Sequence, residues 1–148
     1  MTTQIVELRA QDTHSLRKTI LRDGTASDVV EFDGDDLPGT LHLGVKIDDQ
    51  IVAISTWHVR NHSDHPDRLG VQLRGMATAA PHRGSGTSAA LLAAGVERCR
   101  ASGAELVWAH ARVTALNFYV RNGFATVGDQ YVDATTGLAH VDILQILD

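Results

Sequence analysis

A glycine-rich turn in the second half of the chain is the feature best suited to chemistry. An apolar, strand-like run at residues 71–78 precedes the turn, and apolar residues recur at helical spacing over residues 89–100 after it. Glycines let the backbone approach an anion, and the first N–H groups of a helix are unpaired at the positive end of its dipole. The pattern therefore predicts a phosphate-binding turn. Its residues are Arg83, Gly84, Ser85, Gly86, Thr87 and Ser88.

Two common phosphate-binding motifs do not fit this turn. A nucleotide-hydrolysing P-loop needs G-x-x-x-x-G-K-[ST], and no lysine follows Gly86. A dinucleotide fingerprint needs G-x-G-x-x-G in the first βα unit, but Ala89 stands at the third glycine and strand-like segments precede the turn. The pattern R-x-x-G-x-G/A does match, with Arg83, Gly86 and, as a departure, Ser88. An ordinary helix start is the alternative interpretation of the turn alone.

A second motif occupies residues 114–124, which read Thr-Ala-Leu-Asn-Phe-Tyr-Val-Arg-Asn-Gly-Phe. We expect one short helix here, with Thr114 as its N-cap and Gly123 at its end. Asn117 alone would suggest a local capping residue, and Tyr119 alone a core aromatic. The interval between the two motifs leaves room for one helix and one strand, the latter at residues 105–111.

Together the two motifs resemble the signatures of the GNAT superfamily of N-acetyltransferases, whose second signature is A-x-N-x-Y followed by x-x-x-G-F. The resemblance covers most of the chain, and residues 73–78 and 32–42 are similar to small, poorly characterised bacterial members. Val120 is a departure, because an acidic residue is frequent there. The resemblance implies one α/β (α+β) domain over residues 1–148. It has a central mixed, mostly antiparallel sheet of about six to seven strands, about four helices, and a splayed parallel pair of strands at the cofactor cleft.

The expected strands follow the same order along the chain. They lie at residues 4–9, 41–47, 50–60, 71–78, 105–111, 124–130 and 140–147, with a first helix at 12–22. Residues 41–60 form a hairpin that turns through Asp48 and Asp49. Gly75 interrupts a bulky strand and predicts a β-bulge or a close ligand approach, although a glycine required only by core packing is the alternative.

The resemblance implies transfer of an acetyl group from acetyl-CoA to a primary amine of a small molecule, by direct attack in a ternary complex. Tyr119 matches the position whose phenol faces the cofactor sulfur, so it is the candidate general acid. The candidate cofactor-binding residues are Met76, Ala77, Thr78, Arg83, Gly84, Ser85, Gly86, Thr87, Ser88, Asn117 and Tyr119. A sensor that binds acyl-CoA without turnover and an acetyltransferase of protein or peptide amines are the alternatives.

The general base is left open by the sequence. The candidates are Glu31, Asp33, His42, His58, His110 and a chain of water molecules. Arg74 shares one face of its expected strand with Gln72 by strand alternation. If that face lines the acceptor cleft, Arg74 favours an amine that also carries a carboxylate.

Composition narrows the class of protein and the compartment. A net charge of −5 argues against nucleic acid as the main partner. No apolar run is long enough to span a membrane, and the single cysteine, Cys99, is expected to be a buried structural thiol in a reducing cytoplasm. The polar loop with His62 and His65 matches no zinc pattern, so no metal is expected. A homodimer and a monomer are both open.

Overall fold

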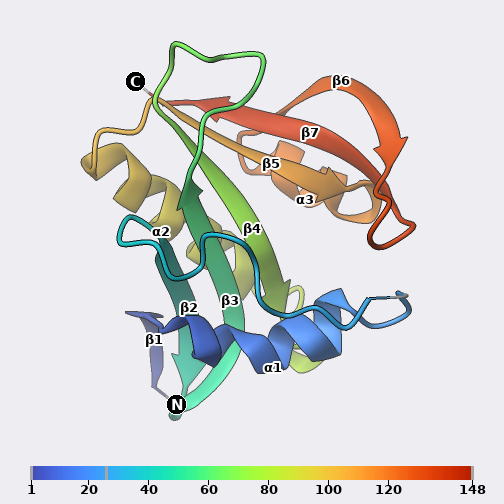
Figure 1. The fold of residues 1–148 in the computed structure, drawn as a ribbon. Coiled ribbons are helices and arrows are strands. Elements are labelled where there is room, and N and C mark those ends of the chain that lie inside the picture. Colours follow the sequence, from blue (N-terminus) through green and yellow to red (C-terminus); the bar gives the residue numbers. More distant parts are fainter. Residues whose placement is uncertain (1, 26, 148) are drawn as a thin grey trace.

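A single seven-stranded sheet forms the centre of the computed structural model, which describes residues 2–25 and 27–147 (Figure 1). The strand order is β1-β2-β3-β4-β5-β7-β6, and neighbouring strands are antiparallel except for the parallel pair β4 and β5. This arrangement confirms the expected mixed, mostly antiparallel sheet. The strands are β1 (Thr3–Glu7), β2 (Leu41–Ile47), β3 (Gln50–Val59), β4 (Gly70–Thr78), β5 (Leu106–Arg112), β6 (Ala125–Val132) and β7 (Ala139–Ile146).

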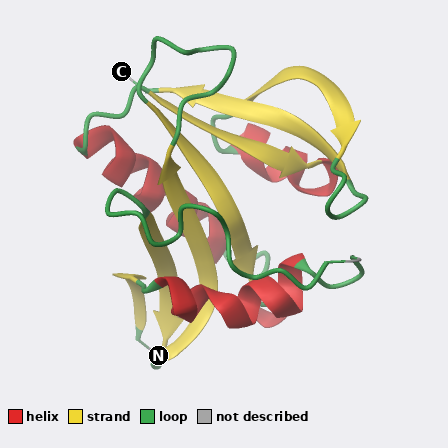
Figure 2. Ribbon diagram, viewed as in Figure 1, coloured by secondary structure: helices red, strands yellow, loops and turns green. Residues whose placement is uncertain are grey.

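Helices cover both faces of the sheet (Figure 2). The short α1 (His14–Leu16) continues a 3-10 turn (Ala10–Thr13) and runs into a π-helical turn (Arg17–Leu21) on one face. On the opposite face lie α2 (Thr87–Ala101) and α3 (Leu116–Arg121). Within the described residues there are three α-helices, against an expectation of about four, because the other helical turns are 3-10 or π. None of these helices is long and apolar enough to span a bilayer.

The main core lies between the sheet and the α2–α3 face. Trp57 of β3 is 1% exposed and packs directly on Gly95 of α2. A Cβ added at Gly95 would lie 1.8 Å from the Trp57 ring, so this close approach of helix and sheet requires glycine. Cys99 is buried in the same core, and burial raises the pKa of its thiol to about 12, as expected for a structural thiol.

Two local predictions had different outcomes. The β2–β3 hairpin does turn through Asp48 and Asp49, which have φ values of 50° and 68° as in a two-residue primed turn. The prediction that Thr114 caps the helix of the second motif is wrong. Thr114 lies inside a 3-10 turn (Val113–Ala115), so α3 starts later, with Ala115 at the N-cap and no side-chain capping bond.

Candidate active site

The parallel strands β4 and β5 pair over only a short length and then separate. The paired residues are Gly70, Val71 and Gln72 of β4 with Leu106, Val107 and Trp108 of β5. Both strands continue beyond this point, β4 to Thr78 and β5 to Arg112, without pairing with each other. The expected splayed pair is therefore present, and it leaves backbone groups of both strands free to face a ligand.

A β-bulge at Gly75 turns β4 away from β5. Against β3, Thr56 pairs with Arg74 and Ile54 pairs with Ala77, so Gly75 and Met76 both stand opposite the single residue between Ile54 and Thr56. Gly75 has a φ of 63°, which side chains rarely adopt. A Cβ at Gly75 would also lie 2.9 Å from the Phe32 ring. The predicted bulge is confirmed, and the group that approaches the glycine is the side chain of Phe32.

A cleft of about 180 Å³ opens where the two strands separate. Met76 and Arg74 line it from β4, His110 and Arg112 from β5, and Tyr119 from α3. Ala109 and Ala111 pack with Tyr119 in the core, so His110 between them points to the opposite face of the sheet. The cleft therefore brings Tyr119 and His110 together from the two faces.

Tyr119 is buried, and its surroundings keep the phenol protonated. The ring makes edge-on contacts with Phe118 and Phe124, at centroid distances of 5.2 and 5.7 Å. Within the described chain, its hydroxyl has no hydrogen-bond partner. Burial raises the pKa of Tyr119 to about 12, so at neutral pH the group carries a proton that it can donate.

The glycine-rich turn has the features of an anion site. Gly86 is the N-cap of α2 with a φ of 85°, and no side chain caps the first N–H groups of the helix. A Cβ at Gly84 or Gly86 would meet nothing within 4 Å, so packing does not explain these glycines. Two physical reasons for glycine at these positions remain. Both residues have a positive φ, and the space in front of their backbone is open.

The other predicted cofactor residues occupy different positions around the cleft and the turn. Ala77 and Thr78 are buried at the end of β4, where Thr78 Oγ1 lies 2.6 Å from Ser88 Oγ and ties the strand to the start of α2. The Arg83 Nε–H donates to the Thr78 carbonyl at 3.1 Å, which fixes Arg83 beside the turn. Asn117 is exposed on α3 and does not line the cleft.

His110 is the one general-base candidate that lines the cleft among the described residues. Its Nδ1 lies 2.5 Å from Asp142 Oδ1 of β7, and Tyr131 of β6 donates its hydroxyl to the same oxygen at 2.6 Å. With Nδ1–H donated to Asp142, the other nitrogen, Nε2, carries a free lone pair. Glu31 and Asp33 are exposed, His42 and His58 are buried, and none of the four lines the cleft.

Asp142 is a fully engaged carboxylate. His62 Nε2 lies 3.1 Å from its Oδ2, and His62 Nδ1 accepts the Asp64 backbone N–H, so Nε2 is the donor. Burial raises the pKa of Asp142, but the hydrogen bonds from Tyr131, His110 and His62 outweigh it and hold the pKa below its usual value. The carboxylate stays charged and fixes the ring of His110.

Comparison with known proteins identifies the family. The sequence profile of the Acetyltransferase (GNAT) family matches residues 7–124, most of the chain. This chain belongs to the acetyltransferase (GNAT) family.

Comparisons with individual proteins find relatives that cover most or nearly all of this GNAT protein. It is 24% identical over 128 residues to the uncharacterized N-acetyltransferase YitI of Bacillus subtilis (strain 168), covering 86% of each chain. The crystal structure of Escherichia coli ElaA superposes with a TM-score of 0.78 at 20% identity, covering 97% of this chain and 99% of that one. FeeM, an N-acyl amino acid synthase from uncultured soil microbes, has a TM-score of 0.82 at 11% identity, with 98% and 91% covered. Family membership makes acyl transfer, with an acyl-CoA donor, the general activity of the chain.

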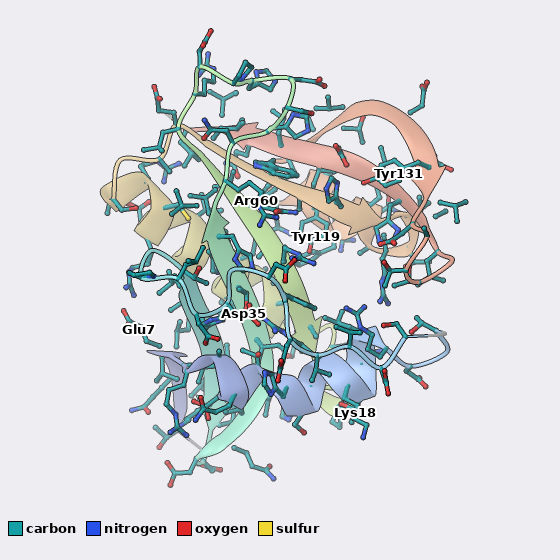
Figure 3. All side chains as sticks on the ribbon, in the orientation of Figure 1. Glu7, Lys18, Asp35, Arg60, Tyr119 and Tyr131 are labelled. Carbon is teal, nitrogen blue, oxygen red and sulfur yellow. The ribbon has the colours of Figure 1, made fainter. Side chains whose placement is uncertain are left out.

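The GNAT fold of this chain contains a buried polar network that sequence reasoning missed. Arg17 is fully buried, and its guanidinium donates to both carboxylate oxygens of Asp35, at 2.7 and 3.2 Å, and to Thr56 Oγ1 at 2.8 Å. His42 contacts Thr56 Oγ1 at 2.9 Å through Nδ1 and the Asp35 carbonyl at 3.0 Å through Nε2. Asp35 lies in front of β3 in Figure 3, so the network fastens the segment after α1 to the sheet.

Gln72 and Arg74 share the sheet face that carries this network, as strand alternation predicts. Across β3, Gln72 pairs with His58 and Arg74 with Thr56. Gln72 Oε1 accepts the Arg60 Nη1–H at 2.9 Å, while Arg74 lies over the Phe32 ring at 4.4 Å. Both line the cleft.

His58 lies at the edge of the network with neither ring nitrogen hydrogen-bonded to a described group. Burial lowers the pKa of His58 to about 4, with the charge of Arg74 adding to the effect and Asp35 opposing it. The folded pKa is below the unfolded value of 6.5, so the unfolded chain takes up the proton first as the pH falls. The contribution of His58 is therefore complete above pH 6.5 and is lost as the pH falls towards 4.

We predict that the free energy of unfolding falls more steeply in the wild type than in His58→Gln between pH 6.5 and 4. The difference should reach at most roughly 3 kcal/mol, from the two pKa values. Urea unfolding at several pH values measures it, with His65→Gln, on the neighbouring loop, as the control. If the free energy of unfolding changed with pH in parallel for the wild type and His58→Gln, His58 would have the same pKa in the folded and unfolded states.

Proposed function

We propose that this protein transfers an acetyl group from acetyl-CoA to a primary amine of a small molecule, by direct attack in a ternary complex. The observation that carries the proposal is the meeting of Tyr119 and His110 at one cleft from opposite faces of the sheet. A protonated phenol and an oriented imidazole are the two proton-handling groups that amide formation requires. A sensor that only binds acyl-CoA needs neither. The single cysteine of this protein, Cys99, is buried and free, which suits a reducing compartment, so we propose the cytoplasm as its location.

The donor binds with its pyrophosphate at the turn before α2. Unpaired N–H groups, the dipole of a 15-residue helix and Arg83 favour a dianionic group there. The acyl end then lies along β4 near Met76, where the strands have separated.

The acceptor amine must lose a proton before it can attack. A primary amine has a pKa of about 10 and is mostly an ammonium at neutral pH. His110 Nε2 takes this proton, while Asp142 stabilises the imidazolium that results. The amine nitrogen then bonds to the acyl carbon, the C–S bond breaks, and the nitrogen loses its second proton, which replaces the one that Tyr119 gives to sulfur. The products are an N-acetyl amine, CoA and one proton, which His110 releases to solvent.

The departing thiolate receives a proton from Tyr119. Its pKa of about 12 lies roughly three units above that of an ordinary thiol, so the phenol is a weaker acid than the sequence alone suggests. The proton therefore moves only as negative charge develops on sulfur, and the phenol first acts as a hydrogen-bond donor.

A small acceptor fits the dimensions of the cleft. Its volume of about 180 Å³ lies below the range of roughly 300–1,000 Å³ for drug-sized ligands. The segment after α1, fastened by Arg17 and Asp35, covers one side of it. This cover favours a metabolite over a protein segment.

The variant Gly86→Glu should abolish binding of acetyl-CoA. It places a side chain and a negative charge in the open space in front of the helix N-terminus, and it also strains a positive φ. Calorimetry with acetyl-CoA measures the loss, with circular dichroism to show that the variant is folded. Glu97→Gln, on the exposed far end of α2, serves as the control. Unchanged affinity in a folded Gly86→Glu protein contradicts the assignment of the turn.

The variant Tyr119→Phe should lower kcat by about 10²–10⁴-fold, the usual effect of a general acid or base. The KM for acetyl-CoA should change little, because the ring still packs on Phe118 and Phe124. Steady-state release of CoA thiol measures both constants. Turnover within a few-fold of the wild type would mean that water protonates the thiolate.

The variant His110→Gln should lower kcat/KM by about 10²–10⁴-fold at neutral pH. The loss should shrink as the pH approaches the pKa of the acceptor amine, because solvent then removes the proton. A pH–rate profile separates this behaviour from a structural defect, and His65→Gln is the matched control outside the cleft. A deficit that stays constant with pH would exclude His110 as the base.

A further inference from the structure

Three arginines from three separate elements line the cleft on its acceptor side. Arg22 follows the π-helical turn, Arg74 lies at the bulge of β4, and Arg112 ends β5. Asp133 is the one carboxylate that lines the cleft with them, among the residues described. The chain as a whole carries a net charge of −5, so this positive region is a local feature and not a consequence of composition.

Two of these guanidiniums are held in place by backbone carbonyls. Arg22 donates its Nε–H to the Val29 carbonyl at 2.7 Å, and Arg112 donates an Nη2–H to the Leu21 carbonyl. Both bonds orient a guanidinium and leave its remaining N–H groups available. Neither arginine has an ion-pair partner in the described parts of the chain.

Arg74 is the least satisfied of the three. Over residues 2–25 and 27–147, its guanidinium has no hydrogen bond and no ion pair, and its recorded contact is the Phe32 ring at 4.4 Å. Arg17, which lies over the same ring at 3.8 Å, is by contrast neutralised by Asp35. Phe32 therefore holds Arg74 in position without supplying a negative charge.

The three positive charges of the cluster outnumber the one carboxylate, Asp133, that lines the cleft with them among the described residues. Burial lowers the pKa of Arg74, and the charges of Arg60, Arg17 and Arg22 lower it further, with Asp35 opposing. Burial also lowers the pKa of Arg112, and Arg22 adds to the effect, while the Asp133 carboxylate opposes it, as it does for Arg22. An arginine does not lose its proton in proteins, so three positive charges remain beside one carboxylate in the cleft, and a bound anion would reduce their repulsion.

We propose that the acceptor is an amine that also carries an anionic oxygen group, bound by Arg74 together with Arg22 and Arg112. A guanidinium fork matches a carboxylate or a phosphate through two parallel hydrogen bonds, so both groups share the required chemistry. Bound this way, the acceptor lies in the cleft that His110 lines. This inference rests on the proposed acyl transfer and adds the class of acceptor.

The test is a panel of matched acceptors assayed by thiol release from acetyl-CoA. Alanine is compared with alaninamide and ethylamine, and phosphoethanolamine with ethanolamine, so that carboxylate and phosphate are assessed separately. The wild type should prefer an anionic member over its neutral partner by about 10- to 100-fold in kcat/KM, the range for hydrogen bonds to a charged group. A preference for alanine identifies the anionic group as a carboxylate, and a preference for phosphoethanolamine identifies it as a phosphate.

Arg74→Lys separates the fork from the charge. It should raise the acceptor KM about 10-fold and leave the KM of acetyl-CoA unchanged, and Arg74→Met should remove the preference for the anionic member. Arg68→Lys, on the exposed loop before β4, is the matched control. A neutral or polycationic amine as best acceptor, with Arg74→Lys unaltered, would overturn the inference while leaving acyl transfer intact.

A readout independent of turnover keeps the two proposals apart. Calorimetry on the protein saturated with CoA should detect N-acetylalanine or N-acetylphosphoethanolamine, and Arg74→Met should abolish that binding. If no amine supports thiol release but this Arg74-dependent binding is present, acyl transfer fails and the anion site stands. Absence of both the preference and the binding would overturn the anion site.

Discussion

The separation of β4 from β5 is the constraint on which the rest of this structure depends. Parallel strands that continued to pair beyond Gln72 and Trp108 would close the sheet and leave no cleft. The bulge at Gly75 prevents this, and it requires both a positive φ and the absence of a Cβ. The ligand-facing backbone of β4 and the convergence of Tyr119 and His110 both follow from that one irregularity.

Phe32 links this irregularity to the buried network. Its ring packs on Gly75 and is shared by three guanidiniums, those of Arg17, Arg22 and Arg74, at 3.8, 5.5 and 4.4 Å. The Arg17–Asp35 pair is buried, and such pairs add little net stability but are costly to break, by about 3–5 kcal/mol. Its role is best understood as fixing where the covering segment, and so Phe32, sits on the sheet.

Sequence reasoning captured the features that are local in the chain. Alternation, helical spacing, the turn at Asp48 and Asp49 and the two family motifs predicted the strands, the splayed pair and the position of Tyr119. Thr114 was misassigned because a 3-10 turn, which has no distinct sequence pattern, delays the start of α3. The sequence could not single out His110 among the candidate bases, because its contact with Asp142 joins residues 32 positions apart on two different strands.

The acceptor side was predicted least completely, for the same physical reason. Arg74 was identified by strand alternation, but Arg22 follows the π-helical turn, Arg112 is the last residue of β5, and the two meet only through the fold. Arg17 resembles any exposed helical arginine in sequence, and its burial depends on Asp35 and Thr56 from later segments.

The most direct test of the account is whether release of CoA from acetyl-CoA requires an amine. The purified protein is incubated with acetyl-CoA and a panel of primary amines, while thiol is followed by absorbance and the amines by mass spectrometry. An N-acetyltransferase that works by direct attack should release thiol only when an accepted amine is present, with one acetyl group gained by that amine for each thiol released. Binding of acetyl-CoA without amine-dependent release across the panel would contradict this proposal and identify a protein that senses acyl-CoA.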